Sequence, residues 1–588
     1  MMFNNRPTGT SRFCIKILLL LLFAAVIASI MVLSWVPPVS RDALTHHLAV
    51  PKLYLQQGGI HEIPSIPFSY YPMNLDLLYI LPLYLKNDIL PKFIHFSFGL
   101  LTAWLIFSYL RKRLDGIWAS GAALFFLSLP IIVKLSITVY VDLGLVFFST
   151  AALMALFKWI ESRFKFRYLI FSAISCGLAL GTKYNALIVL FLLTAFVPLL
   201  YNQRAKRESD TKEEISGPGT LSRQMRAIGC GILFCLIALI VFSPWMVRNY
   251  IWKANPVFPL YNSYFNPPKS GLSPAPDTNV TSEINPSKSA NDKNVSSVRG
   301  PFAVRKVVYR EAWWEIALIP ARIFFQGRDD DPRYFDGKLN PFLFLLPIFA
   351  FFQLATTSAA VTVEKKALLW FAILFILYAY LKTDMRIRYI TPAIPPLVIL
   401  ATFGFYQIHK YFSQRQLQGR GPRAQIMVSV LAAVIFIFNG LYIIHQFKVV
   451  DPFSYIGGRV GRDAYITKYR PEYAVIQYAN RHLGADAKLL VLFMGNRRYY
   501  SDRDMIFGIN LFRKIIKKSD TAQAAQKELQ HRGFTHLLIR YDLFNQWTDK
   551  QFNTIEKMRL KTFFARDTRQ VLSQKGYGLF QLASTPNL

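Results

Sequence analysis

Acidic and basic residues stand beside the ends of several long apolar segments of this sequence. Asp42 follows the apolar run 15–36, and Asp142 opens the apolar stretch DLGLVFF. Basic residues hold comparable places at Lys183, Arg248, Arg386 and Arg388. A charged side chain near membrane hydrocarbon is unfavourable unless it faces a water-filled cavity or a partner. These residues are therefore the candidates for chemistry.

Two carboxylates and several fixed cations suit the chemistry of a phosphate-linked substrate. Arg and Lys stabilise the negative charge that develops on a departing phosphate. A carboxylate can take the proton from an attacking hydroxyl or amine, or hold a divalent metal that helps the phosphate depart. Asp42 fits the proton-accepting role best. Asp142 can bind an acceptor, share a metal with Asp42, or cap a helix start, where an acid is favoured in any case.

The basic candidates also have simpler interpretations. Lys183 and Arg388 can reach lipid headgroups from helix ends without taking part in chemistry. Arg248 stands between Trp245 and Trp252, which fits a belt of aromatic residues at the membrane surface.

The aromatic and histidine candidates are likewise open to two interpretations. His46 and His47 can bind a metal or an acceptor, but adjacent residues of a helix cannot point the same way, so one of them is expected to be structural. Tyr70 and Tyr71 can stack on a sugar ring or belong to the aromatic belt.

The composition indicates a polytopic all-α membrane protein that carries these residues between its spans. The chain has 588 residues, of which 53% are hydrophobic and 17% charged, and apolar runs of ~20 residues recur along it. Eleven transmembrane helices are predicted, over 15–36, 89–110, 117–135, 140–160, 168–182, 185–201, 227–246, 341–357, 367–383, 390–408 and 425–446.

The basic loops define an orientation for these spans. The formal charge is +34, and basic residues of membrane proteins collect in short cytoplasmic loops. Alternation of the spans places Arg111-Lys112-Arg113 and the loops 158–167, 204–226, 365–366 and 410–423 together on the cytoplasmic side. The N-terminus is then cytoplasmic and the C-terminus outside, and no nucleic-acid partner is needed to explain the charge. All the candidate residues above face outward.

The segments between the spans carry further structure on the outer side. The stretches 42–57 and 73–85 are amphipathic and too short to cross, so they are expected to lie in the membrane interface. If 73–85 were instead a short span, the downstream topology would invert, which the cytoplasmic basic loops argue against. The long outer loop 248–340 includes a disordered piece, 267–297, and a short interfacial helix over 313–327.

The last part of the chain is soluble in character. Apolar runs predict strands at 487–493, 534–541 and 577–583, and periodic segments predict helices at 470–484 and 520–533. We expect a transmembrane domain over 1–447 and a small extracytoplasmic, periplasmic α/β domain over 448–588. Neither a phosphate-binding loop nor metal-ligand spacing occurs in this domain. The four cysteines suggest neither a disulfide framework nor a zinc site.

Several motifs, in this order on this topology, resemble a known superfamily. The chain is similar to the lipid-phosphate-sugar-dependent glycosyltransferases of the GT-C fold, which include the dolichyl-phosphate-mannose protein mannosyltransferases and the bacterial aminoarabinose transferases. The resemblance covers roughly residues 15–450. It rests on Asp42 after the first span and on YYPMNLDLLY, YVD, GTKYNA, PWMVRNYIWKANPVFPLY, FDGKLNPFLFLLP and RYITPAIPPL.

The resemblance implies an activity and a role for Asp42. Asp42 would be the catalytic aspartate, and the outward cavity would receive a sugar from an undecaprenyl-phosphate carrier, with inversion at the anomeric carbon. Many members pair this aspartate with an adjacent glutamate. Here the neighbour is Ala43, so the paired motif is incomplete, which weakens the case for carrying over a metal site. A divalent metal stays open as a cofactor, as do the donor sugar and the acceptor.

The first hypothesis is therefore an inner-membrane glycosyltransferase whose partners are a polyprenyl-phosphate sugar donor, a lipid, glycan or protein acceptor, and membrane lipids. Asp42 and Asp142 are its catalytic acids. The donor phosphate would be bound by Lys183, Arg248, Arg386 and Arg388, and the sugar or acceptor by His46, His47, Tyr70 and Tyr71.

Two other classes of protein compete with this hypothesis. One is a transporter or flippase for a lipid-linked saccharide, and the other is a non-catalytic assembly or sensing protein. Transporters often show internal repeats and ionisable residues near the membrane midplane. Here the ionisable residues gather at outer span ends and no repeat is visible, which favours the enzyme.

Overall fold

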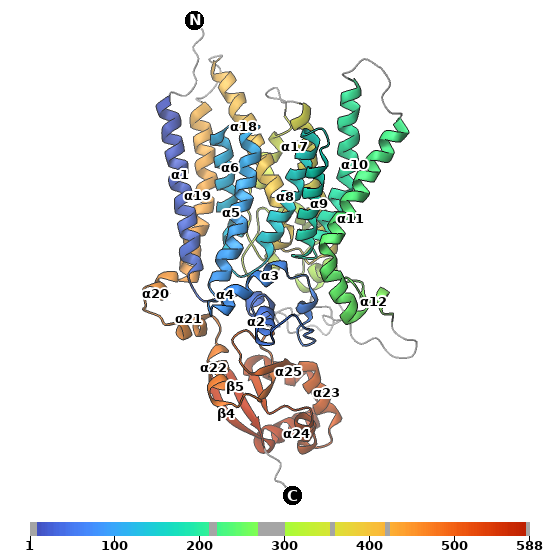
Figure 1. Ribbon diagram of the computed structural model, residues 1–588. Helices are drawn as coiled ribbons and strands as arrows, with labels where there is room; N and C mark the ends of the chain where they lie inside the picture. Colours follow the sequence, from blue (N-terminus) through green and yellow to red (C-terminus); the bar gives the residue numbers. More distant parts are fainter. Residues whose placement is uncertain (1–8, 211–219, 268–299, 353–358, 418–423, 584–588) are drawn as a thin grey trace.

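The computed structural model describes residues 9–210, 220–267, 300–352, 359–417 and 424–583. They form a helical unit followed by a part built around a β-sheet. The first residues of α1 (Gly9–Ser34) and this sheet lie at opposite ends of the molecule (Figure 1). Almost all of the predicted disordered piece, 267–297, lies outside the described residues.

Seven helices of the described chain are long and apolar enough to cross a membrane. They are α1 (Gly9–Ser34), α5 (Leu90–Arg111), α8 (Asp142–Glu161), α10 (Ala186–Asp210), α11 (Thr220–Lys253), α18 (Ile394–Leu417), which a short 3₁₀ helix η6 (Ile387–Ala393) precedes, and α19 (Ala424–Val450). The chain is thus a multi-pass membrane protein, as its composition predicts. α8 and α18 are mostly buried inside the unit, whereas α1 and α19 leave most of their apolar side chains exposed. Such faces suit contact with lipid tails, which are themselves apolar.

The predicted span 117–135 is bent in the structure. It forms α6 (Gly116–Ser128) and α7 (Pro130–Ser136), whose axes meet at 63°. The break falls at Pro130 because proline has no N–H to donate and its ring clashes with the preceding turn of a helix. Counted as one broken span, this pair would be an eighth.

The other predicted spans are shorter or more polar than expected. α9 (Phe166–Leu180) has 15 residues. α16 (Phe342–Phe349) begins the predicted span 341–357, of which residues 353–357 lie outside the described part of the chain. α17 (Ala359–Lys382) begins before its predicted span and includes Glu364, Lys365 and Lys366. Eleven spans thus exceed the seven or eight that length and composition support, and the count stays a prediction.

A buried ion pair lies at the end of the helical unit that is farthest from the sheet. The Arg113 guanidinium donates to both carboxylate oxygens of Glu364, from Nε at 2.6 Å and from Nη2 at 2.7 Å. The Tyr109 hydroxyl donates to the same carboxylate at 2.8 Å, and Arg113 also pairs with Glu161. The segments that carry three of the predicted cytoplasmic loops therefore share one end of the molecule.

The two amphipathic stretches after α1 form short helices, as predicted. The first is a π-helical turn, η1 (Ala43–His47), followed by α2 (Ala49–Gln56), and the second is α3 (Asn74–Leu78) followed by α4 (Ile80–Tyr84). A 3₁₀ turn, η2 (Pro67–Tyr70), lies between them. These helices lie at the end of the helical unit that is nearest the sheet (Figure 1).

The long segment between α11 and α16 contains only short elements in its described residues. They are α12 (Asn262–Phe265), α13 (Pro301–Ala303), η4 (Val304–Val308), α14 (Trp313–Ala317), α15 (Ile319–Arg322) and η5 (Pro332–Tyr334). The predicted helix 313–327 is thus two helices. Pro320 stands in the first turn of the second, the place in a helix where proline is tolerated.

The C-terminal part is a mixed five-stranded sheet with helices on both faces. Its strands are β1 (Lys488–Leu492), β2 (Asp504–Phe507), β3 (His536–Arg540), β4 (Thr568–Gln574) and β5 (Tyr577–Leu582), in the order β2-β1-β3-β5-β4. β1 pairs in parallel with β2 and β3, and β5 pairs antiparallel with β3 and β4. The helices are α20 (Pro452–Ile456), α21 (Arg462–Tyr469), α22 (Tyr473–His482), α23 (Ile509–Lys518), α24 (Ala522–His531), α25 (Tyr541–Gln551), α26 (Thr554–Thr562) and the π-helical η7 (Phe563–Asp567).

Alternate residues of the central strands explain why both faces are covered. Leu490 and Leu537 pack with α23 and α24 in one hydrophobic layer, while Leu489 and Leu538 pack with α22 in another. A parallel sheet buried on both faces requires strands that are apolar throughout. The predicted strands β1, β3 and β5 have that composition. β2 has only four residues and β4 is a polar edge strand, so neither gives an apolar run.

Candidate active site

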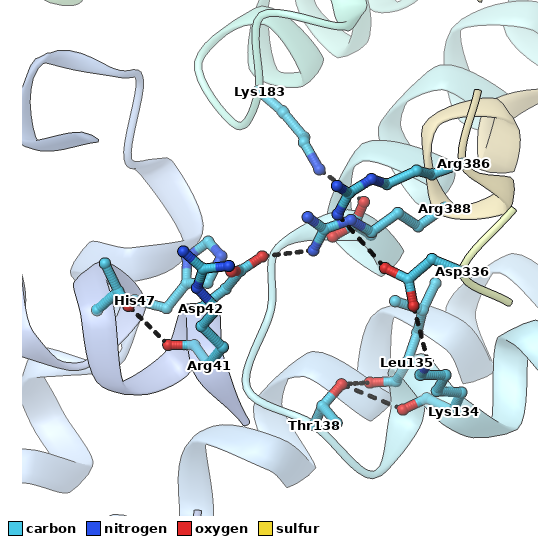
Figure 2. Close-up of polar contacts among 12 residues, drawn as sticks. Arg41, Asp42, His47, Lys134, Leu135, Thr138, Lys183, Asp336, Arg386 and Arg388 are labelled. Atoms are coloured by element: carbon cyan, nitrogen blue, oxygen red, sulfur yellow. Dashed lines mark hydrogen bonds and ion pairs between the residues drawn. The ribbon is translucent and has the colours of Figure 1, made fainter. Parts of the chain in front are cut away.

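Four predicted site residues come from separate segments and meet at the end of the helical unit nearest the sheet. Asp42 is the residue before η1, Asp142 begins α8, Lys183 lies between α9 and α10, and Arg388 belongs to η6. Figure 2 shows Asp42, Arg388 and Lys183 pointing toward a common centre. Segments that are far apart in the sequence therefore build one polar site.

Helix α3 fits between these segments because two glycines leave room for it. A Cβ atom on Gly181 would stand 2.2 Å from Nδ2 of Asn74, and one on Gly144 would stand 2.4 Å from a methyl of Leu75. The Asn74 amide also donates to the Gly181 carbonyl at 2.8 Å. Both glycines are needed for this close approach, which fixes α3 between the start of α8 and the loop of Lys183.

Each of the two predicted acids is paired with a predicted cation. Arg388 Nη1 contacts Asp42 Oδ2, and Lys183 Nζ lies 2.7 Å from Asp142 Oδ1. The Asp142 side chain is 1% exposed, whereas those of Lys183 and Asp42 are 22% and 23% exposed. A buried carboxylate requires such a counter-ion, so these pairs explain how the charges are held at this depth.

Two tyrosines flank the cations. The Arg388 guanidinium lies 5.5 Å from the ring centre of Tyr140 and 5.4 Å from that of Tyr389. Lys183 Nζ lies 5.8 Å from the Tyr389 ring. Tyr389 therefore contacts both cations, at distances where the face of an aromatic ring attracts positive charge.

Asp42, the residue before η1, is ionised, whereas the two histidines of η1 are neutral. Burial alone would raise the pKa of Asp42, but Arg388 and His46 hold it well below its ordinary value. Burial lowers the pKa of His46 to about 3 and that of His47 to about 4. At neutral pH the only charge on this turn is therefore the Asp42 carboxylate.

His47 forms a buried hydrogen bond with an acid on α3. The distance from His47 Nδ1 to Asp76 Oδ1 is 2.7 Å. Burial raises the pKa of Asp76 to about 8 while it lowers that of His47. Both shifts favour the uncharged forms of this buried pair. His46 instead stacks on Phe68, with ring centres 4.4 Å apart.

Arg386 belongs to a second group of charges next to the first. Its guanidinium lies 3.5 Å from Asp336, and Asp336 lies 3.4 Å from Lys134 on α7 (Figure 2). Burial would raise the pKa of Asp336, but Lys134, Arg388 and Arg386 lower it below its ordinary value. A third carboxylate, ionised at neutral pH, thus lies close to the two arginines.

Arg248 contacts the first outer segment and neither of the predicted acids. Its Nη2 donates to the backbone carbonyls of Tyr70 at 2.7 Å and Tyr71 at 3.1 Å. Its guanidinium lies 4.5 Å from the Trp245 ring and 4.9 Å from the Trp252 ring. The predicted aromatic surroundings of Arg248 are present, and they hold it against the Tyr70–Tyr71 backbone.

The two tyrosine side chains point to different partners. The Tyr70 hydroxyl donates to Glu62 at 2.6 Å. The Tyr71 ring packs on Tyr184, the residue after Lys183, with ring centres 5.3 Å apart. Tyr71 is therefore nearer to the paired acids and cations than Tyr70 is.

Several residues at this site carried no usable signal in the sequence. Asp336 lies within the motif FDGKLNP, but an acid in a long loop is common and nothing linked it to Arg386. Lys134 ends a predicted span and Asp76 sits in an amphipathic helix, where both have ordinary interpretations. Only the folded chain brings them to Arg388 and His47.

No group of three or more His, Cys, Asp and Glu side chains in the described ranges is arranged to hold a metal ion. Ala43, the residue after Asp42, is fully buried. The side chains beside Asp42 are cations and histidines, so the chemistry of the site is best derived from these residues.

Comparisons with known proteins bear on the fold and on one stretch of the sequence. Residues 89–213 match the family model described as dolichyl-phosphate-mannose-protein mannosyltransferase. No curated protein matches the chain in sequence.

Solved structures of ArnT from Cupriavidus metallidurans share the architecture of nearly the whole chain. ArnT from Cupriavidus metallidurans bound to undecaprenyl phosphate superposes with a TM-score of 0.53 at 13% identity, over 96% of this chain and 98% of that one. Its apo state gives the same TM-score at 12% identity, over 95% and 97% of the two chains. The predicted resemblance is therefore confirmed at the level of the fold.

Proposed function

We propose that the protein is an inner-membrane glycosyltransferase that moves a sugar from a polyprenyl-phosphate carrier to a lipid, polysaccharide or protein acceptor on the outer face. The observation that carries this proposal is the convergence of Asp42 and Asp142 with Lys183 and Arg388 at one end of the helical unit. Undecaprenyl phosphate, which is bound in the ArnT structure, is the carrier that we propose.

The side chains divide into phosphate-binding and acid–base groups. Arg388 and Lys183, with Arg386 beside them, bind the carrier phosphate and stabilise the charge that develops when it departs. Asp42 takes the proton from the acceptor hydroxyl or amine, or orients that group. Asp142 is the second acid and positions Lys183. His46, His47 and Tyr71 border the space in which the sugar and the acceptor would meet.

The proposed reaction is a single displacement. The acceptor oxygen or nitrogen forms a bond to the anomeric carbon from one face while the bond from that carbon to the phosphate oxygen breaks on the other. The acceptor proton passes to Asp42, and the carrier leaves as polyprenyl phosphate. Configuration at the anomeric carbon inverts because attack and departure occur on opposite faces.

The ion pair between Arg388 and Asp42 links donor binding to base strength. In the absence of a donor, Arg388 lowers the pKa of Asp42 and makes it a weak base. A donor phosphate that binds Arg388 neutralises part of its charge, which raises the pKa of Asp42. The aspartate thus becomes a stronger base when a donor is in place.

The domain arrangement and orientation are part of the proposal. We place the transmembrane domain at 1–447, with eleven spans and a cytoplasmic N-terminus, and the periplasmic domain at 448–588. The gathering of Arg113, Glu161 and Glu364 at the end opposite the sheet supports this arrangement. The basic side chains of the loops then face the cytoplasm, and membrane lipids surround α1 and α19.

The test is glycosyl transfer by the purified protein with radiolabelled undecaprenyl-phosphate sugars. Wild type is expected to release carrier or label an acceptor extract, and Asp42→Asn is expected to lower turnover by about 10²–10⁴-fold, the usual contribution of acid–base catalysis. Asp451→Asn, which removes a carboxylate from a surface ion pair with Lys468, is the matched control and should turn over normally.

The same assay separates the competing classes of protein. Binding of the labelled carrier without turnover by wild type would favour a transporter or a non-catalytic binder. Full activity in Asp42→Asn would exclude the proposed role of Asp42.

A further inference from the structure

The turn that carries the site residues has an unusual backbone that leaves one carbonyl free. In η1 the Leu48 amide donates to the Ala43 carbonyl at 2.9 Å, one residue further back than in an α-helix. In an α-helix the Leu48 amide would donate to the Leu44 carbonyl. In η1 the Leu44 carbonyl therefore lacks its usual helical donor. Leu44 is 2% exposed, so water cannot easily reach its backbone.

The free carbonyl is used by a loop of the C-terminal part. The backbone amides of Arg498 and Tyr499 both donate to the Leu44 carbonyl, each at 3.1 Å. These two residues belong to the loop 495–502, which lies between β1 and β2. A segment near the end of the chain thus supplies the hydrogen bonds that the π-helical turn does not make internally.

The loop 495–502 also binds α2, the helix that follows η1. Lys52 on α2 donates from Nζ to the Tyr499 carbonyl at 3.0 Å, to the Ser501 carbonyl at 2.9 Å and to the Asp502 carboxylate at 2.8 Å. All three ammonium donors of Lys52 are therefore directed at the loop. The Arg498 guanidinium also donates to the Ser65 hydroxyl and carbonyl, both at 3.0 Å.

The chain just before Asp42 is held from the same side. The Tyr500 hydroxyl donates to the Pro38 carbonyl at 2.8 Å, and Arg470, which precedes α22, donates to the Val39 carbonyl at 2.5 Å. Contacts from the C-terminal part thus bracket Asp42, with Pro38 and Val39 on one side and Leu44 on the other.

The Tyr499 ring joins the loop to the start of α8 as well. It packs against a small buried cluster made of Ala43, Leu48, Tyr79 and Val139. Val139 lies just before Asp142 in the chain, and Ala43 follows Asp42. The Tyr499 side chain therefore packs against a cluster that includes a residue from the segment of each predicted acid.

We propose that the loop 495–502 is a positioning element of the active site, which holds the turn η1 and so sets the direction of Asp42. This inference rests on the proposed glycosyl transfer for its effect on turnover. The loop itself touches no reacting group. Removing the hydrogen bonds between this loop and the first outer segment is expected to lower kcat, because a displacement of about 1 Å of a catalytic group can slow a reaction by about 10²-fold.

The test compares Lys52→Met with Lys86→Met in the full-length protein in nanodiscs. Both lysines line the same cavity of about 440 Å³ between the first outer segment and α22. The Lys86 side chain is exposed, and its ammonium makes no hydrogen bond or ion pair within the described ranges, so it is the matched control. Lys52→Arg keeps a charged donor and serves as the rescue variant.

Hydrogen exchange of the backbone amides of residues 43–48 gives the first readout. We expect exchange about 10-fold faster in Lys52→Met than in Lys86→Met, with partial recovery in Lys52→Arg. Equal exchange in the two methionine variants would overturn the inference. This measurement uses no substrate, so it stands even if the wild-type protein transfers no sugar.

Steady-state turnover gives the second readout. Lys52→Met is expected to lower kcat about 10-fold or more, with the KM for the labelled undecaprenyl-phosphate sugar changed less than 2-fold. Faster exchange with an unchanged kcat would show that the loop only stabilises the fold, and the positioning role would be wrong.

Discussion

At the scale of single residues, each of the two predicted acids is paired with a cation from another segment of the chain. This pairing allows the charges to be buried. Asp42 and Arg388 lie 346 residues apart in the sequence, and Asp142 and Lys183 lie 41 apart. An unpaired buried carboxylate would be protonated instead. The pairs keep both acids ionised, and they leave two cations where a phosphate can compete for them.

The Asp42 pairing predicts a pH profile for the reaction. Because Arg388 and His46 lower the pKa of Asp42 below its ordinary value of about 4, the carboxylate stays ionised as the pH falls from 8 to about 5. The kcat/KM of the wild type should therefore show no loss from Asp42 in that window. In Arg388→Gln the carboxyl stays buried without its cation, so its pKa rises and the acid limb moves to higher pH.

Profiles of kcat/KM for wild type and Arg388→Gln test this shift. The same lowered pKa contributes stability that is present above pH 4 and is lost as the pH falls through the folded value. An acid limb at the same pH in both proteins would contradict the pairing.

The predictability of individual residues follows from whether their local sequence is unusual. Asp42, Asp142, Lys183 and Arg388 stand at span ends, where ionisable groups are unfavourable, and the structure brings them together. Asp76, Asp336 and Lys134 have ordinary positions in the sequence, and only tertiary contacts give them partners. Arg248 shows the reverse case, because a residue at a span end contacts the Tyr70–Tyr71 backbone and not the acids.

At the scale of elements, α3 holds the site together although it has only five residues. It supplies Asp76 to His47, and it packs against the start of α8 and the loop after α9 through Gly144 and Gly181. Such a short helix would not be stable alone. Its position depends on the space that the glycines leave.

Gly181→Ala should therefore disturb the site from a position that carries no chemistry. The added methyl would stand 2.2 Å from Nδ2 of Asn74, so the Asn74 side chain, which accepts a hydrogen bond from Trp245, or α3 or the Lys183 loop must move. We expect a loss of about 1–3 kcal/mol of stability, as for other overpacked sites, measured as a lower unfolding temperature in detergent.

The control for this change is Gly229→Ala on α11, where nothing lies within 4 Å of the added atom. Alanine is favoured over glycine inside a helix, so this variant should unfold at the same temperature as wild type or higher. An equal loss in both variants would mean that close packing at Gly181 is not the cause.

Secondary structure was predictable where the sequence pattern is strong. Prediction failed where tertiary packing determines the local backbone conformation. Long apolar runs gave the positions of α1, α5 and α19, and apolar strands gave β1, β3 and β5. The bend at Pro130, the division of 313–327 and the π-helical turn η1 were not predicted. The last of these depends on amides of Arg498 and Tyr499, which no local pattern around residue 44 can reveal.

At the scale of the whole molecule, a separate group of paired charges lies at each end of the protein. The helices α2, α3 and α4 and the sheet lie at one end (Figure 1), and the buried pair of Arg113, at the end of α5, and Glu364 on α17 lies at the other. Because basic loops stay in the cytoplasm, this division predicts which residues a reagent can reach from each side of the membrane.

Cysteine labelling in intact spheroplasts tests that orientation. In a variant without the native cysteines, Lys575→Cys in the turn between β4 and β5 should react with a membrane-impermeant maleimide. Lys165→Cys, between α8 and α9, should react only after permeabilisation. The reverse pattern would contradict the proposed topology.

The contact between η1 and the loop 495–502 also imposes an order of assembly. Lys52 is made 447 residues before its partner Tyr499, which at ribosomal speed is a delay of roughly 20–90 s. During that interval the spans can insert and pack, yet the aspartate has no fixed direction. In the proposed orientation, Asp42 is held in place only after the C-terminal part has crossed the membrane and folded, so a partly exported chain is expected to insert without catalysing the proposed transfer.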